Sequence, residues 1–379
     1  MQRPQPTEAR PFPAARPNAV AAIRMAAAIS LPLVLASALA RPGAAQTPLT
    51  VGTVTAQPGT TVSGDLQVPA RGADTGTTIP FSIINGSRPG PVLALVAGVH
   101  GYEYPPILAL QRLRTAIDPK DLSGAIILVH VANMPSFLAR TVYYSPVDRK
   151  NLNRVFPGRA DGTLSDRIAD VLTREVIDRS GYVVDLHCGD GNESLRPYLY
   201  WETTGAPGVA EAGRQLALAF GMDHIVIDTS RPTDPKAALY LSNTAITRGK
   251  PATTIESGAL GQTDEESIAR IERGVAGVLR HLKMRETGPR AVDRPVWIGR
   301  NQVLNAGATG LLYPSVERGQ TVAEGALIAR ITDFHGRTLE EIRAPFAGEV
   351  LYVVATPPIT KGEPVGFIGE RATPEEIKR

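Results

Sequence analysis

The sequence predicts an α/β protein in which a mixed, mostly parallel sheet carries helices on both faces, followed by a small all-β region. Two observations support this prediction. Between residues 78 and 285, short β-branched apolar runs alternate with segments of helical periodicity, which is typical of strand-helix-strand units. Beyond residue 289, glycine and proline turns separate β-branched runs at short intervals, which is typical of a small β-sandwich or barrel.

The first 46 residues are typical of an export signal. Four arginines precede the apolar stretch 25–40, and small residues that suit a signal peptidase follow up to residue 45. The apolar stretch is short for a membrane span, which needs roughly 20 residues. We therefore predict a signal peptide over residues 1–45 and a periplasmic or secreted protein. An uncleaved signal that anchors the chain in the membrane is the alternative.

Composition limits the partners of the remaining chain. The chain of 379 residues has a net charge of +3, but residues 1–46 hold five Arg and one Glu, which leaves −1 for the rest. This balance offers no basic face for nucleic acid, and we expect a small-molecule partner, with a homo-oligomer left open.

Cys188 is the only cysteine, so no internal disulfide can form, and we interpret it as a partly buried small residue.

The predicted elements of the α/β part follow one another in a regular order. Strands are predicted over residues 78–84, 91–97, 126–132, 182–186, 224–227 and 251–255, and helices over 105–115, 164–179, 208–221 and from the capping box at 263–266 to about 285. Residues 136–162 show no clear periodicity, and such a long loop in a compact domain is usually functional. We place one domain at 46–290 and a C-terminal β domain at 291–379.

Polar residues stand at the ends of three of these strands. They are His100 with Glu103, His187, and Glu256. The carboxyl ends of parallel strands meet at one edge of a sheet, so these residues are expected to converge. Two histidines and one carboxylate leave an open position on a tetrahedral Zn²⁺ for water, so we expect one zinc ion per chain on His100, Glu103 and His187. Glu256 is then the general base and the proton donor to a leaving amine.

Two further expectations concern Asp185 and His224. Asp185 precedes His187 by two residues on the same strand face and is expected to orient its imidazole. His224 has no partner at ligand spacing and is expected to face solvent.

The long loop contains an Asn-Arg pair, Asn153 and Arg154, among few apolar residues. Such a pair can hold a carboxylate through charge-assisted hydrogen bonds. The residues alone equally allow a solvated loop.

Four short motifs together resemble one known family. They are GVHGYE at 98–103, NLNRVFPG at 151–158, DLHCG at 185–189 and TIESG at 254–258. In order and spacing they resemble the succinylglutamate desuccinylase/aspartoacylase family, a branch of the zinc carboxypeptidase-like fold, over about residues 90 to 290. The resemblance also extends to a C-terminal β domain, which we expect to be barrel-sandwich-like.

The resemblance implies a role for each matched residue. It places zinc on His100, Glu103 and His187, makes Glu256 the acid/base, and assigns the substrate carboxylate to Asn153 and Arg154. It also implies a further arginine that binds substrate or stabilises the oxyanion, for which we choose Arg140, with Arg149 as the alternative.

Taken together, these observations predict that the protein is an exported, zinc-dependent deacylase that hydrolyses the amide bond of an N-acyl amino acid. One alternative is a metallocarboxypeptidase or amidase that acts on short or cell-wall peptides. A second alternative is a non-catalytic binding protein on the same fold.

Overall fold

The computed structural model describes residues 45–377. The signal peptide predicted over residues 1–45 therefore lies outside the described residues, apart from Ala45. Within the described range, no helix combines the length and the apolar character that a bilayer span requires.

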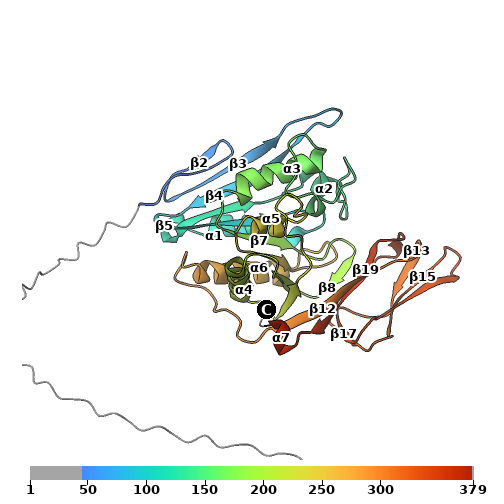
Figure 1. The fold of residues 1–379 in the computed structure, drawn as a ribbon. Coiled ribbons are helices and arrows are strands. Elements are labelled where there is room, and N and C mark those ends of the chain that lie inside the picture. The colour runs from blue at the N-terminus through green and yellow to red at the C-terminus, as the bar shows by residue number, and fades with distance from the viewer. Residues whose placement is uncertain (1–44, 378–379) are drawn as a thin grey trace, which may run out of the picture. The chain divides into compact units, whose positions relative to one another are not determined.

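A long mixed sheet runs through the described residues (Figure 1). Across the sheet its strands are β3 (Thr60–Val68), β4 (Thr77–Asn85), β6 (Ser123–Val129), β5 (Arg88–Ala97), β7 (Tyr182–His187), β11 (Ala252–Glu256), β9 (Tyr198–Glu202), β10 (His224–Asp228), β12 (Val296–Asn305), β19 (Pro364–Arg371), β17 (Gly348–Val354) and β14 (Thr321–Val322). In the α/β part, β5 pairs in parallel with β6 and β7, β7 with β11, and β9 with β10. Strands β3, β4 and β6 pair antiparallel, as do β9 and β11. The predicted mixed, mostly parallel sheet is confirmed.

Helices cover both faces of this sheet. One face carries α1 (Tyr104–Ala116), α4 (Pro207–Phe220) and α6 (Glu265–His281), and the other carries α3 (Leu164–Leu172) and α5 (Leu241–Thr247). Strand β5 shows why both faces need covering helices. Successive side chains of a strand point to opposite faces, so its apolar residues lie on both sides of the sheet. Leu93 and Leu95 enter the core under the first set of helices, and Ala94 and Val96 enter the core under the second.

Several short elements were not expected. The predicted loop at 136–162 contains most of α2 (Met134–Ala139) and a 3-10 turn at Leu152–Arg154. The small pair β1 (Leu49–Val51) and β2 (Val54–Ala56) lies where the Gly-, Thr- and Val-rich sequence from residue 50 to 80 predicts short strands. Strands β8 (Glu193–Leu195) and β9 and helix α5 were missed, as were α2 and the 3-10 turn. Each of these is short, so its hydrophobic period is weakly marked in the sequence.

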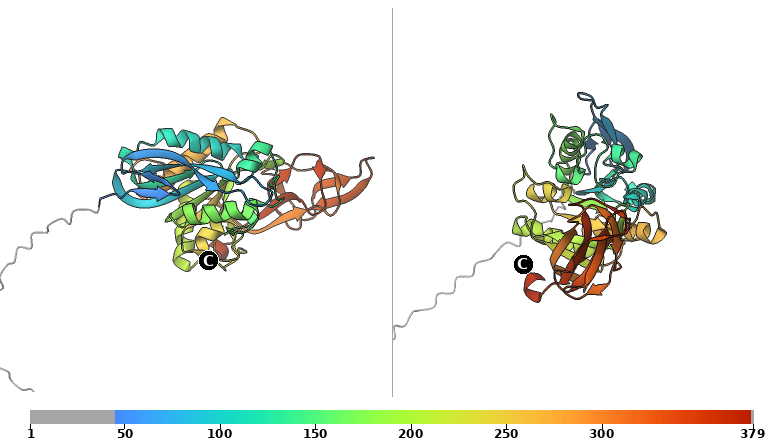
Figure 2. Two further views of the ribbon diagram at one scale, coloured as in Figure 1. Left: turned by 90° about the horizontal axis from the view of Figure 1, so that it is seen from above. Right: turned by 90° about the vertical axis from the view of Figure 1, so that its right-hand side faces the viewer.

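The C-terminal β region continues the main sheet. Strand β12 pairs in parallel with β10 and antiparallel with β19, and β8 pairs with β17. Within the described range, a second sheet of four strands packs on a core shared with these strands; it contains β16 (Thr338–Arg343), β15 (Leu327–Thr332), β13 (Gly310–Pro314) and β18 (Pro358–Ile359). Figure 2 shows these orange to red strands at one end of the α/β part. A short helix, α7 (Pro374–Ile377), follows β19.

The contact between the two regions corrects the expectation for His224. This residue begins β10 and is buried, with Nε2 at 3.2 Å from Oε2 of Glu349 on β17. The prediction that it faces solvent was wrong because its partner lies far along the chain.

Candidate active site

His100 and Glu103 lie in the turn between β5 and α1. Gly98 begins this turn with a φ of +70°, and a Cβ at this position would lie 3.0 Å from the Cα of Val131. The turn therefore requires glycine. Two prolines in the first turn of α1 start the helix directly after Glu103, which is its N-cap residue. The turn thus directs an imidazole and a buried carboxylate to the same place.

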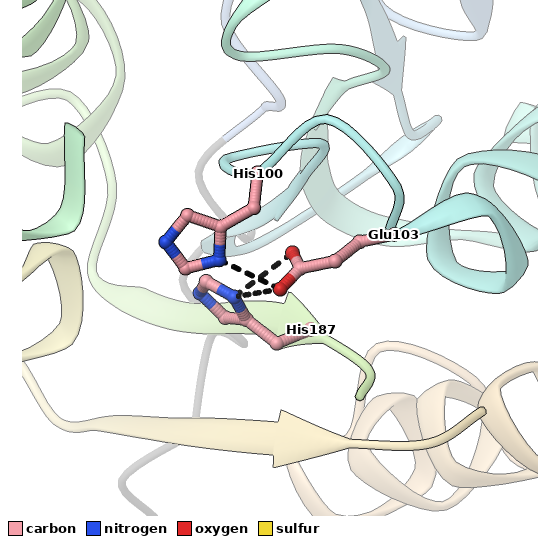
Figure 3. A group of neighbouring side chains, drawn as sticks. All are labelled: His100, Glu103 and His187. Atoms are coloured by element: carbon pink, nitrogen blue, oxygen red, sulfur yellow. Dashed lines mark hydrogen bonds and ion pairs between the residues drawn. The ribbon is translucent and has the colours of Figure 1, made fainter. Parts of the chain in front are cut away.

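His187 reaches this place from the neighbouring strand. It is the last residue of β7, which pairs in parallel with β5 so that Leu186 stands opposite Ala97. The carboxyl ends of adjacent parallel strands lie side by side. Figure 3 shows His100, Glu103 and His187 pointing toward one another, with one ligand atom of each within 4.8 Å of the others.

The hydrogen bonds around His100 test whether this group suits a metal ion. The backbone N–H of Asn153 donates to Oδ1 of Asn151 at 2.8 Å, which identifies that atom as the carbonyl oxygen. The same oxygen lies 3.1 Å from Nε2 of His100, so Nε2 carries the proton. Nδ1 then presents a lone pair to Oε1 of Glu103 at 2.7 Å. Two acceptors repel at this distance unless a proton or cation lies between them, so the donor set fits a metal ion such as Zn²⁺.

His187 is held in a similar way. Its Nδ1 lies 3.0 Å from Oε2 of Glu103, and its Nε2 lies 3.0 Å from Oδ1 of Asp185. Asn153 Nδ2 lies 3.2 Å from the same Nε2. The Asp185 carboxylate is thus close enough to Nε2 to form an ion pair with the imidazole when the ring is protonated. The placement of Asp185 matches the expectation that it orients this imidazole.

The charges in this group favour the binding of positive charge. Burial alone would raise the pKa of Glu103, but His187 and His100 lower it to about 2. Burial opposes protonation of His187, yet Asp185 and Glu103 raise its pKa well above the ordinary value. Glu103 therefore stays ionised between the two imidazoles, and its negative charge favours the binding of a cation.

Glu256 stands beside this group at the end of β11. Its partner in the parallel pairing with β7 is His187, and its partner in the antiparallel pairing with β9 is Tyr198. Burial raises the pKa of Glu256 well above its ordinary value, and although His187 opposes this shift, the charge of Glu103 reinforces it. A carboxyl group that binds a proton this readily suits proton transfer at the site.

Of the arginines and the asparagine expected at the site, one arginine and the asparagine lie at the cavity and the other two arginines do not. Asn153 and Arg154 line the cavity described below, with Oδ1 of Asn153 accepting from the backbone N–H of Leu241 at 2.8 Å. Arg140 caps the end of α2 with a φ of +52°, and Arg149 has a φ of +58° in the following loop. Neither of these two lines the cavity, so their assigned roles remain predictions.

A cavity of about 670 Å³ opens above the three candidate ligands and Glu256. Cys188, buried as expected, forms part of its lining, and the C-terminal β region contributes Asn301, Val303 and Pro364. The wall is rich in aromatic side chains, namely Tyr143, Tyr144, Tyr198, Tyr200, Tyr240, Tyr352 and Phe367. Sequence reasoning missed these residues because no motif joins them. The alternating tyrosines of β9 were the one local signal that could have found Tyr198 and Tyr200.

A network of two carboxylates holds Tyr143 against His100. The Tyr143 hydroxyl donates to Oε1 of Glu193 at 2.6 Å, and its backbone N–H donates to Oδ2 of Asp190 at 3.1 Å. The Tyr143 ring meets the His100 ring edge-on, with 6.2 Å between centroids. Burial raises the pKa of Glu193 to about 7 and that of Asp190 to about 6. Because Glu193 belongs to β8, this network links the C-terminal β region to His100.

Comparison with known proteins gives consistent matches. Residues 89–282 match the succinylglutamate desuccinylase/aspartoacylase catalytic domain. The protein named N-alpha-acetyl-L-2,4-diaminobutyric acid deacetylase, from Halomonas elongata, is 32% identical over 262 residues, which cover 67% of this chain and 74% of that protein.

Two solved structures share the fold. A succinylglutamate desuccinylase from Silicibacter sp. is 27% identical, with a TM-score of 0.72. The product-bound ectoine utilization protein EutE (DoeB) from Ruegeria pomeroyi is 28% identical, with a TM-score of 0.73. Each match covers 82% of this chain and 95% of the other.

Proposed function

Because the chain belongs to the succinylglutamate desuccinylase/aspartoacylase family, we propose that it is a zinc-dependent deacylase that hydrolyses the amide bond of an N-acyl amino acid. The name of the relative from Halomonas elongata supports a small acylated amino acid as the substrate. The observation that carries the proposal is the position of Glu256 beside the His100, Glu103 and His187 group, at the base of one cavity.

The chemistry of the donors supports zinc. His100 and His187 through Nδ1 and Glu103 through its carboxylate would hold the ion, with Asn151 and Asp185 fixing the two imidazoles. When bound, zinc would act as a Lewis acid, which lowers the pKa of a water molecule towards about 7 and polarises a carbonyl group.

The residues of the chain perform the proton transfers. The carboxylate of Glu256 accepts a proton from the attacking water and passes it to the leaving nitrogen. Burial raises the pKa of Glu256, which favours the protonated carboxyl group that this second transfer requires.

Arg154 provides the positive charge for the carboxylate of the substrate. Its guanidinium lines the cavity, and its Nη1 donates to the backbone carbonyl of Asn153 at 2.8 Å. Both ends of the Asn153 amide contact protein groups, so we propose that Asn153 acts mainly by holding this turn in place.

A screen for amine release tests the proposal. The zinc-loaded protein would be incubated with N-acetyl and N-succinyl amino acids and with short peptides, and the free amines would be measured. We expect release from an N-acyl amino acid. Release of C-terminal residues from peptides alone would instead support a carboxypeptidase, and absence of both turnover and bound zinc would support a binding protein.

We further propose that the protein is exported, because residues 1–45 combine a positive segment, an apolar stretch and small residues. Mass spectrometry of the protein from its native cell would show a shortened N-terminus outside the cytoplasm. An intact chain in the cytoplasmic fraction would contradict export.

A further inference from the structure

Arg231 is a largely buried arginine that lines the cavity and belongs to none of the sequence motifs. It lies between β10 and α5, and 13% of its side chain is exposed. Its Nε forms an ion pair with Oδ2 of Asp228, the last residue of β10. Oδ1 of Asp228 accepts from the backbone N–H and the hydroxyl of Ser230, at 3.0 and 2.9 Å. The Asp228 carboxylate therefore lies against the Nε side of the guanidinium as an ion pair, without a hydrogen bond to Nε.

Tyr240 fixes the plane of the same guanidinium. The Cζ of Arg231 lies 3.6 Å from the centroid of the Tyr240 ring, and the Cζ of Arg154 lies 4.5 Å from the same centroid. Guanidinium groups bind the faces of aromatic rings in this way. One phenol ring thus brings two arginines from separate segments of the chain to one part of the cavity.

The two guanidinium groups have more donors than the protein satisfies. Within residues 45–377, neither Nη atom of Arg231 donates to a protein acceptor, and Arg154 forms no ion pair with a carboxylate. Oε1 of the other nearby carboxyl group, Glu202, accepts from the Ser242 hydroxyl. Its Oε2 has no hydrogen-bond partner among the described residues, and the side chain does not line the cavity. A buried guanidinium normally has acceptors for its N–H groups. The missing acceptor is therefore expected to come from a ligand in the cavity.

We propose that Arg231, together with Arg154, binds the carboxylate of the substrate and so selects N-acyl amino acids over their uncharged analogues. This inference rests on the proposed deacylase function and adds a specificity-determining residue to it. The Nη fork of an arginine matches the two oxygens of a carboxylate, and Asp228 and Tyr240 hold this fork before the ligand arrives. A carboxamide cannot pair with two positive charges in this way.

Calorimetry tests the inference without turnover. The zinc-loaded full chain would be titrated with L-2,4-diaminobutyrate, as a product-like carboxylate, and with its carboxamide. We expect the wild type to bind the carboxylate roughly 10- to 100-fold more tightly, and Arg231→Met to lose this preference. Arg231→Lys keeps the charge but loses the fork, so its preference should be intermediate.

Arg214→Met is a matched control. Arg214 also stacks on aromatic rings, with its Cζ at 5.6 Å from Trp201 and 5.2 Å from Trp297, but it does not line the cavity. Its loss should cost similar stability and leave the preference for the carboxylate unchanged. Thermal unfolding of each variant shows whether it is folded, and Arg231→Lys provides the test if Arg231→Met is not.

The kinetic readout separates this inference from the proposed function. With N-acetyl-L-2,4-diaminobutyrate, Arg231→Met should raise KM by roughly 10- to 100-fold and change kcat little, while turnover of the carboxamide analogue stays the same. If the wild type deacylates nothing but still binds the carboxylate through Arg231, the deacylase proposal fails and this inference stands. Folded Arg231 variants with wild-type affinity for the carboxylate would overturn the inference.

Discussion

Glu256 and His187 stand opposite each other in the parallel pairing of β11 with β7. The same register places Thr254 opposite Asp185, so all four side chains share one face of the sheet. A slip of one residue between these strands would turn Glu256 to the other face. The register of the sheet therefore places the candidate base beside a candidate ligand, without help from the loops.

We predict that Glu256→Gln abolishes most turnover and leaves the metal in place. The amide keeps the size of the side chain but cannot accept the proton, so kcat should fall on the order of 100- to 10,000-fold. Steady-state kinetics and elemental analysis for zinc measure the two effects. The exposed Glu265 provides a control, because Glu265→Gln should leave both values unchanged. Full activity of Glu256→Gln would rule out the assigned role.

Asp185→Asn should weaken metal binding. The Oδ1 of Asp185 lies 3.0 Å from Nε2 of His187, and loss of this partner should reduce zinc affinity roughly 10- to 100-fold. Competition with a chelating dye measures the affinity. Asp161→Asn, at an exposed position, is the control. An unchanged dissociation constant for zinc would show that Asp185 does not orient the ligand.

The candidate metal group could be predicted because each of its members directly follows a strand with a clear pattern. Strands β5, β7 and β11 are short runs rich in apolar and β-branched residues, and a glycine follows each of them at residues 98, 189 and 258. A parallel sheet then brings these ends together, so short motifs far apart in the chain predict one site.

The remainder of the cavity depends on contacts that leave no local pattern. Arg231 becomes a site residue only because Tyr240 and Asp228 hold it, and neither contact follows from spacing. Similarly, His224 is buried by Glu349, which lies 125 residues further along the chain. Arg140 could not be placed because the turn after α2 sets its direction, and the sequence did not reveal that helix.

Tyr143→Phe should reduce stability and activity together. The change removes the donor to Oε1 of Glu193, which leaves a buried acceptor unpaired and should lower the free energy of unfolding by about 1–3 kcal/mol. His100 packs against the same ring, so a modest fall in kcat is expected. Urea denaturation and steady-state kinetics measure both effects. Tyr313→Phe, at an exposed position of β13 outside the cavity, is the matched control and should change neither.

The stability of the protein is expected to depend on pH through the buried Glu202. Glu202 is buried, with 1% of its surface exposed, and its Oε2 has no protein partner in the described range. Burial raises the pKa of Glu202 to about 7, although Arg231 and Ser242 oppose the shift. The folded protein therefore holds this proton more tightly than the unfolded chain does. The contribution to stability is fully present below the unfolded pKa of 4.5 and is lost as the pH rises to about 7.

Glu202→Gln should remove this loss, because the amide does not titrate. Between pH 4.5 and 7, the wild type should lose about 3 kcal/mol of unfolding free energy that the variant retains. Urea denaturation of both proteins across pH 4.5–8 measures the difference, and subtraction cancels the titration of the other groups. Glu211→Gln, at an exposed position, should follow the wild type at every pH. A constant difference between wild type and Glu202→Gln would mean that Glu202 titrates alike in the folded and unfolded chains, and that burial does not hold its proton.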